Sequence, residues 1–354
     1  MTKFRMASLV AWMLALTAAA WAAGKDSVTL DSGRIEANLT ILREGWDQLE
    51  VDRDGDGKAD EPIPADTVAE VSFEDEPQAF RAAKVALKYG RMEDAAENFA
   101  KALEDKTARA FWLQPHANYH LGECRRALAE ADKALYPEAR AAYEAALTAS
   151  PDGRLAPFAV ERTGLCLLAE GKSDEAVQRF RKLADGAYGK AFELRGKLRL
   201  AQATGQANQH EEALKTVEEV VARATAEGRK ELLGEARLVR PELLIGAKRY
   251  AEAREQFLKV ASEATEQDVN TKARAYNGVG DCLLAEGQPR DALLAYLRVR
   301  VLYFKSDSEY PRALFGAARC FTLLKEPARA KEIVDLLARD YATTAWAVRA
   351  QQEL

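Results

Sequence analysis

The chain has 354 residues, of which 48% are apolar and 30% charged, and its net charge is -5 at pH 7. This composition is ample for folded domains with buried cores and excludes a chain that is disordered throughout. It shows no basic excess of the kind that proteins use to bind phosphate backbones, so we expect no nucleic acid partner.

Residues 1–22 have the pattern of a secretory signal peptide. Lys3 and Arg5 precede an apolar run from Ser8 to Trp21, and small residues flank Trp21 at a cleavage signal that ends with Ala22. The alternative is a permanent membrane anchor, but the run is shorter than the ~20 residues that a spanning helix needs. We therefore expect an exported protein, periplasmic, envelope-associated or secreted, with no permanent membrane span after cleavage.

Residues 23–77 are predicted to form a small antiparallel β domain, which we call the head. Apolar and polar residues alternate in short stretches that are separated by turn sequences, around Val28–Leu30, Arg34–Leu42, Leu49–Val51, Ile63 and Val68–Phe73. The head carries a net charge of -11, whereas residues 79–354 carry +4. About fifty residues are marginal for an independent hydrophobic core, so the head is expected to pack against the first helical repeat.

An acidic run in the head is a candidate calcium site. Asp52, Asp54 and Asp56 alternate before Gly57, and Asp60 follows, so several carboxylates can converge on one cation. The run resembles the first half of an EF-hand or dockerin-type loop, although Ile63 stands where the bidentate glutamate belongs. The alternative is an acidic hairpin turn, which Asp-Gly pairs favour by themselves.

From Gln78 onward the chain repeats one pattern seven times. A small alanine is followed four residues later by an apolar, usually aromatic residue, and successive copies are 37 to 44 residues apart. Two positions four apart share a helix face. In the clearest copy a close-contact glycine, Gly164, and a turn glycine, Gly171, precede this pair. The alanines are Ala95, Ala139, Ala176, Ala213, Ala253, Ala292 and Ala330.

This pattern resembles the tetratricopeptide repeat (TPR) family over roughly residues 78–354. The resemblance implies an all-α superhelical solenoid of about seven helix hairpins with a concave surface. The amphipathic segment from Tyr341 to Leu354 would be its C-terminal capping helix. Three copies have Asn208, Lys248 or Lys325 in place of the turn glycine, and Pro241 occupies a close-contact position, so we expect the fourth, fifth and seventh copies to be bent or irregular.

The resemblance also indicates a partner groove. Its register predicts a mixed aromatic and charged concave surface made by Tyr119, Glu123, Phe158, Arg162, Phe315 and Arg319. Some family members clamp a terminal carboxylate with a Lys and Asn pair, but the corresponding residues here are Phe80 and Lys84, so that clamp is not carried over.

Two further sets of side chains have structural interpretations. His116, His120 and Cys124 lie at helical spacing, but residues eight apart are separated by ~12 Å of helix rise, so packed histidines are favoured over a metal site. The four cysteines Cys124, Cys166, Cys282 and Cys320 occupy equivalent repeat positions, which are too far apart for disulfides. They are expected to be buried core residues.

We interpret the chain as a non-enzymatic scaffold or adaptor of the bacterial cell envelope that binds a protein or peptide on its concave face. No cofactor is expected other than possible calcium. The alternative is a calcium-responsive surface or secreted protein that acts through the head, with the repeats as a spacer. A wall-polymer hydrolase is disfavoured because no nucleophile elbow and no carboxylate pair in a catalytic context is found.

Overall fold

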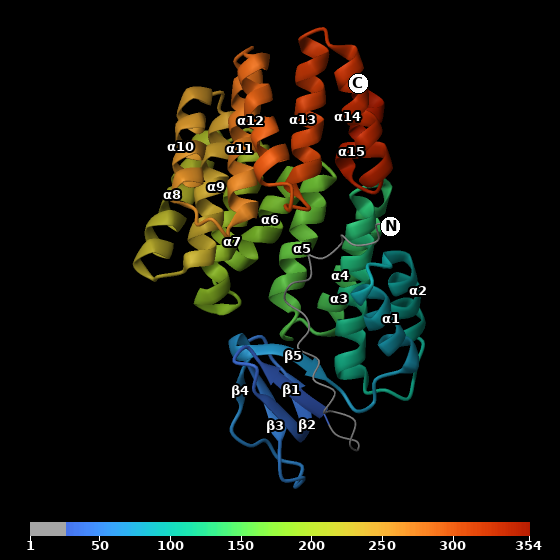
Figure 1. The fold of residues 1–354 in the computed structure, drawn as a ribbon. Helices are drawn as coiled ribbons and strands as arrows, with labels where there is room; N and C mark the ends of the chain where they lie inside the picture. Colours follow the sequence, from blue (N-terminus) through green and yellow to red (C-terminus); the bar gives the residue numbers. More distant parts are fainter. Residues whose placement is uncertain (1–25) are drawn as a thin grey trace. The chain divides into compact units, whose positions relative to one another are not determined.

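The computed structural model describes residues 26–354, and the predicted signal peptide lies outside them. These residues divide into two compact units, each of which is described by itself. Unit 1 contains residues 26–129, 134–170 and 186–192, and unit 2 contains residues 130–133, 171–185 and 193–354. Figure 1 traces the chain from the strands in blue to the last helices in red.

The head is an antiparallel sheet with the strand order β4-β3-β2-β1-β5. Its strands are β1 (Asp26–Leu30), β2 (Ile35–Glu44), β3 (Gln48–Asp52), β4 (Ile63–Pro64) and β5 (Val68–Ser72), with a 3-10 turn, η1 (Ala65–Thr67), before β5. Neighbouring strands are joined in register, for example Val28 opposite Val71 and Ile41 opposite Val51. The predicted strand regions are confirmed.

Fifteen α-helices follow in the described residues, and none of these helices is long and apolar enough to cross a membrane. They are α1 (Gln78–Lys88), α2 (Met92–Ala102), α3 (Ala110–Ala129), α4 (Tyr136–Ala149), α5 (Ala156–Ala169), α6 (Ser173–Ala184), α7 (Gly189–Gln206), α8 (His210–Ala226), α9 (Lys230–Gly246), α10 (Tyr250–Glu263), α11 (Val269–Ala285), α12 (Pro289–Leu302), α13 (Glu309–Leu323), α14 (Pro327–Asp340) and α15 (Ala345–Glu353), with a 3-10 turn, η2 (Lys133–Leu135), before α4. Seven consecutive helix pairs and one last helix match the predicted fold class.

In unit 1 the head shares one hydrophobic core with α1, α2 and α3. Val28 and Leu49 of the sheet belong to the same buried cluster as Phe80, Phe99 and Trp112 of the helices. A five-stranded sheet of this length cannot bury enough apolar surface alone. The helices supply the missing cover.

Charged contacts reinforce this packing. The Arg109 guanidinium binds Asp26 at 2.5 Å and Asp75 at 3.0 Å, and the Trp112 indole N–H donates to Asp75 at 2.9 Å. Phe73, just after β5, stacks on the Trp112 ring with centroids 4.3 Å apart. The head therefore packs against the first helices of unit 1 through apolar and charged contacts together.

The repeat positions act as the pattern predicts. All seven anchor alanines are buried, and six of the residues four later are buried too, with Val334 half-buried. The bulky residue covers the close-contact glycine of its own repeat. A Cβ on Gly122 would lie 2.7 Å from the Tyr143 ring, and one on Gly280 would lie 2.6 Å from the Tyr296 ring. These positions require glycine because an aromatic face occupies the space of a side chain.

The turns of the fourth, fifth and seventh copies have the same backbone conformation as the turns with glycine. Asn208, Lys248 and Lys325 have φ values of 62°, 59° and 61°, in the same left-handed region as Gly171 at 77° and Gly287 at 75°. The turns therefore keep their geometry, and the three side chains accept a conformation that L-residues disfavour. Pro241 lies inside α9 without ending that helix.

All four cysteines are buried and free, as predicted. Burial raises the pKa of each thiol to about 12. At neutral pH these sulfurs are protonated and behave as small apolar core groups.

Candidate functional site

The aspartate loop, residues 52–61, follows β3. Ligand oxygens of Asp52, Asp54 and Asp60 lie within 4.8 Å of one another. Asp52 accepts hydrogen bonds from the backbone N–H groups of Gly55 at 2.7 Å and Gly57 at 2.9 Å, which lower the pKa of its carboxyl group. The loop therefore gathers three carboxylates on a framework that its own backbone supports.

Asp56, the fourth predicted ligand, is outside this group. Its carboxylate accepts the Lys58 backbone N–H at 2.8 Å and pairs with the Lys58 ammonium at 3.3 Å. The alternation of aspartates predicted convergence of all four, but a local turn directs Asp56 to its own neighbour. Calcium binding stays a prediction.

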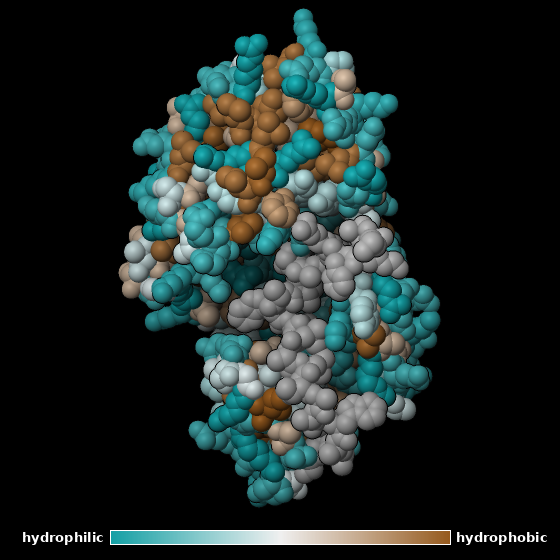
Figure 2. Space-filling view, in the orientation of Figure 1, coloured by the Kyte–Doolittle hydropathy of each residue, from teal (hydrophilic) through white to brown (hydrophobic). Residues whose placement is uncertain are grey.

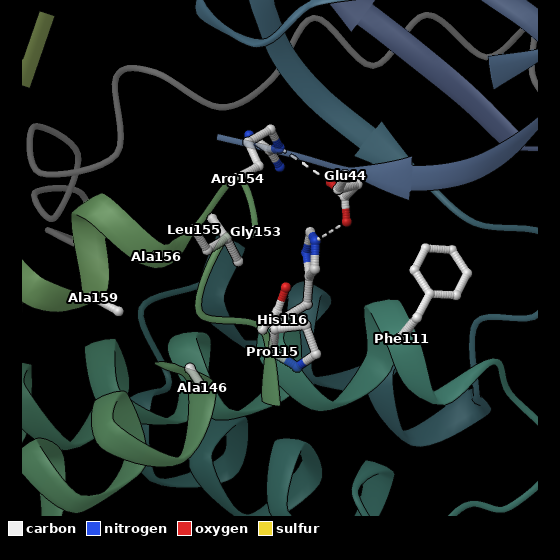
Figure 3. Close-up of a pocket in the computed structure, with 11 residues that line it drawn as sticks. Glu44, Phe111, Pro115, His116, Ala146, Gly153, Arg154, Leu155, Ala156 and Ala159 are labelled. Carbon is white, nitrogen blue, oxygen red and sulfur yellow. Dashed lines mark hydrogen bonds and ion pairs between the residues drawn. The ribbon is translucent and has the colours of Figure 1, made fainter. Parts of the chain in front are cut away.

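His116, which the sequence offered as a possible metal ligand, instead contacts the carboxylate of Glu44. In Figure 3 the Glu44 carboxylate lies between His116 and Arg154, with Glu44 oxygens 2.7 Å from His116 Nε2 and 3.1 Å from Arg154 Nε. Burial would raise the pKa of Glu44, but the contacts with His116 and Arg154 hold it at about 2. A cavity of about 10 Å³, room for a single water, adjoins this group. The contact ties β2 to α3 and to the segment before α5.

His120 and Cys124, the other two candidate metal ligands of this helix, also pack into the protein and do not converge on one point. The His120 ring stacks on Phe99 with centroids 5.3 Å apart, and burial lowers its pKa to about 3. Cys124 is a buried thiol. Within residues 26–354 the one set of three or more potential ligand side chains that lie together is the aspartate group.

In unit 1 the predicted groove residues Glu123 and Arg162 form a closed network. Both the Tyr143 hydroxyl and Arg162 Nε donate to Glu123 Oε1 at 2.7 Å, and Arg126 lies 3.4 Å from Oε2. Burial by itself would raise the pKa of Glu123, but the arginines more than offset that effect and lower it. This carboxylate is already satisfied by its own chain.

Tyr119 and Phe158 make aromatic contacts beside this network. The Tyr119 ring meets Tyr143 edge-on at 5.7 Å, and Phe158 meets Phe192 edge-on at 5.2 Å. Burial raises the pKa of Tyr119 to about 12. The four unit 1 residues of the predicted groove are thus engaged within unit 1, and their role in binding stays a prediction.

In unit 2, the predicted residues Phe315 and Arg319 line a pocket of about 130 Å³, which we call the arginine pocket. Its walls come from α11, α12, α13 and α15. The lining residues are Asp281, Tyr296, Arg312, Phe315, Gly316, Arg319, Trp346 and Arg349.

Asp281 is satisfied from two sides within the arginine pocket. The Tyr296 hydroxyl donates to its Oδ1 at 2.6 Å, and Arg312 Nη2 lies 2.5 Å from its Oδ2. Burial would lower the pKa of Arg312, but Asp281 and Glu309 raise it. The Asp281 carboxylate is therefore held in place by Tyr296 and Arg312.

The arginines of the pocket stack on aromatic rings. Arg349 lies 4.6 Å from the Phe315 centroid and 5.2 Å from that of Trp346. Arg319 lies 5.7 Å from Phe315, and Arg312 lies 6.0 Å from Trp346. Such contacts hold a guanidinium in place while leaving its N–H groups able to bind an anion.

Sequence reasoning did not place five charged or aromatic lining residues in the groove: Asp281, Tyr296, Arg312, Trp346 and Arg349. Asp281 had a visible signal, because it follows Gly280 as Glu123 follows Gly122. Trp346 and Arg349 lie on the last helix, which was assigned only a capping role. Arg312 belongs to the same helix as Phe315 but lies outside the predicted register.

An apolar surface is also exposed in unit 2. Figure 2 shows brown residues gathered over the region that α12 occupies in Figure 1, and Leu294, Val301 and Leu302 of that helix are more than half exposed.

Comparisons with known proteins agree on the fold. A tetratricopeptide repeat protein from Parabacteroides merdae is similar, with a TM-score of 0.52 and 14% identity, over 77% of this chain and 98% of that one. A Rap protein complexed with competence and sporulation factor is 14% identical over 77% of this chain and 81% of that one, with a TM-score of 0.49. No family model and no curated protein sequence matches the chain. The likeness to the first protein supports a TPR-like fold.

Proposed function

We propose that this protein is a non-enzymatic interaction scaffold of a bacterial cell envelope. It binds an extended segment of a partner protein on the first-helix face of unit 2, the surface formed by the first helices of successive repeats within that unit. Stacked TPR-like hairpins display such a face as a rigid surface, which suits recognition of an extended chain. Because one fold can host many functions, the evidence for this function must come from the site.

The arginine pocket is the observation that carries the proposal. It is lined by two exposed or half-exposed arginines, Arg319 and Arg349, over an aromatic floor. Arginine and aromatic side chains dominate the binding energy of protein interfaces. Asp281, the one carboxylate of the lining, is held by Arg312 and Tyr296, so the proposal assigns this pocket to binding.

The envelope location rests on residues 1–22, whose charged start, apolar run and small-residue cleavage signal are those of a signal peptide. N-terminal sequencing of the mature chain, after cell fractionation, tests this part separately. Export with cleavage gives a chain that starts at Ala23, whereas an intact Met1 in the cytoplasmic fraction contradicts it.

The function is tested by capturing partners with residues 23–354 from the native envelope fraction. Mass spectrometry compares the native sequence with Arg319→Glu combined with Arg349→Glu, and with a control variant, Arg329→Glu, on the exposed surface of α14. We expect one stoichiometric protein that the native and control chains retain and the pocket variant loses. Equal capture by all three chains would contradict the assignment to this face.

A second function is not proposed for the aspartate loop. Of the three aspartates Asp52 is buried and Asp54 exposed, and exposed acidic groups are common without an ion. The calcium prediction is therefore kept as a binding test.

A further inference from the structure

The charges of the arginine pocket do not balance. Three guanidinium groups and one carboxylate line it, and the carboxylate of Asp281 already binds Arg312 and Tyr296. Within the described residues Arg319 makes no hydrogen bond or ion pair, and its side chain is exposed. Arg349 pairs at 2.7 Å with Glu353, but that contact joins two side chains of one helix that are 38% and 43% exposed. An exposed pair of this kind contributes little and is readily exchanged.

The floor of the pocket is apolar. Phe315 is buried, and its ring lies 5.5 Å from the ring of Trp346. A ligand that enters is therefore desolvated on one side while it meets guanidinium groups on the other. Charge-assisted hydrogen bonds to arginine are stronger in such a setting than in water.

Gly316 distinguishes this pocket from the Glu123 network of unit 1. Gly316 and Arg162 are equivalent, since each stands two residues before the close-contact residue of its repeat, Ala318 and Gly164. In unit 1 the Arg162 guanidinium lies against the carboxylate of Glu123. In unit 2 Gly316 has no side chain, and the Tyr296 ring packs against it, since a Cβ there would lie 2.5 Å from that ring. The carboxylate of Asp281 instead binds Arg312, which lies one helical turn before Gly316 on α13.

We propose that the arginine pocket binds a carboxylate of the partner chain, either an aspartate or glutamate side chain or the terminal carboxylate, between Arg319 and Arg349. This inference rests on the proposed function and names the chemistry of its site. It also assigns α15 a binding role, because that helix supplies Trp346 and Arg349. The last helix is then a wall of the site as well as the cap of the repeats.

A carboxylate fits better than a phosphate. Arg319, and Arg349 on exchange of its exposed pair with Glu353, can bind the two carboxylate oxygens, each with its own guanidinium. Two guanidinium groups match the two oxygens of a carboxylate, whereas a phosphate presents three oxygens and a charge of -1.5 to -2 at neutral pH. The remaining wall, Phe315 and Trp346, suits the methylene groups of an acidic side chain.

The test selects binders from a random dodecapeptide library on the mature chain, residues 23–354. Selected peptides are then synthesised with each acidic side chain changed to its amide, with the terminal carboxylate as a carboxamide, and with phosphoserine at each acidic position. Fluorescence anisotropy gives Kd for the native chain, for Arg319→Gln with Arg349→Gln, and for the control Arg329→Gln, which removes an arginine stacked on Phe321 and paired with Glu326 outside the pocket.

One acidic group should stand out. Its neutralisation is expected to weaken binding about 10- to 100-fold on the native and control chains, as for lost charge-assisted hydrogen bonds, and less than about 2-fold on the pocket variant. Loss on neutralising a side chain identifies an internal acid, and loss only with the carboxamide identifies the chain end.

Other results overturn the inference and are distinguishable. Peptides that bind without such an acid, or whose acid matters equally in the pocket variant, refute the carboxylate site and leave the scaffold function standing. Tighter binding with phosphoserine refutes the choice of anion. If no peptide binds the native chain, recognition of an extended segment is itself refuted, and the inference falls with it. Circular dichroism melting curves check that all three chains are equally folded.

Discussion

The Tyr296 hydroxyl donates a hydrogen bond to Oδ1 of Asp281 at 2.6 Å, and unit 1 contains the same contact between Tyr143 and Glu123 at 2.7 Å. In both repeats the bulky residue of the second helix covers a glycine and binds the acidic residue that follows it. This recurrent contact joins the packing of a hairpin to the charge pattern of its first helix.

Replacing Tyr296 with phenylalanine tests this contact. The change keeps the ring that covers Gly280 and removes its one hydrogen bond to the Asp281 carboxylate. We expect a loss of about 1–2 kcal/mol in the free energy of unfolding, measured by urea denaturation. Leu297→Ala, a half-buried neighbour on the same helix, serves as a comparison that leaves Asp281 untouched. Unchanged stability of the phenylalanine variant would mean that water replaces the hydroxyl.

The left-handed turns at Lys248 and Lys325 are stabilisation targets. Glycine at either position removes the steric strain that a side chain has at positive φ. The free energy gained in this way is larger than the cost of the extra backbone entropy that glycine loses on folding. Each substitution is expected to raise the free energy of unfolding by about 0.5–1 kcal/mol, measured by thermal and urea unfolding. The converse change Gly171→Lys should destabilise. A loss of stability in both glycine variants would contradict the strain at these turns.

The contact of Glu44 with His116 and Arg154 makes unit 1 sensitive to acid. Its pKa is held at about 2, below the ordinary value of 4.5, so its contribution is full above about pH 4.5 and is lost as pH falls toward 2. The contribution is on the order of 2–3 kcal/mol. We expect Glu44→Gln to be less stable at pH 7 and to lose less stability between pH 5 and pH 3. Parallel pH profiles of the two chains would refute this role.

Calcium binding by the aspartate loop is tested by isothermal titration. If Asp52, Asp54 and Asp60 bind the ion, a Kd of about 10⁻⁴–10⁻³ M is expected, as in extracellular sites. Asp54→Asn and Asp60→Asn should each abolish measurable binding, whereas Asp56→Asn should retain the affinity within about 2-fold because its carboxylate lies outside the group. The absence of heat at 10 mM calcium, or equal loss in all three variants, would count against the site.

The helical repeats were determined by the sequence itself, because their signals are local. An alanine and an aromatic residue four apart share one helix face, so Ala139 with Tyr143 and Ala292 with Tyr296 could be recognised without any knowledge of the fold. Alternation of apolar and polar residues identified the strands for the same reason. The turns at Asn208, Lys248 and Lys325 were predicted to be irregular, but they have the positive φ of the glycine turns. Lysine and asparagine reach this conformation at a modest energetic cost, which the packing of the neighbouring helices outweighs.

The arginine pocket was decided by the tertiary structure. Phe315 and Arg319 follow from the helix register, but Asp281 and Arg349 are 68 residues apart in the sequence and meet only when α11, α13 and α15 pack together. The same holds for Glu44 and His116, which are brought within 2.7 Å by the packing of the head on α3. A sequence pattern reports which face of a helix a residue occupies, whereas contacts between elements depend on how several faces fill a common space.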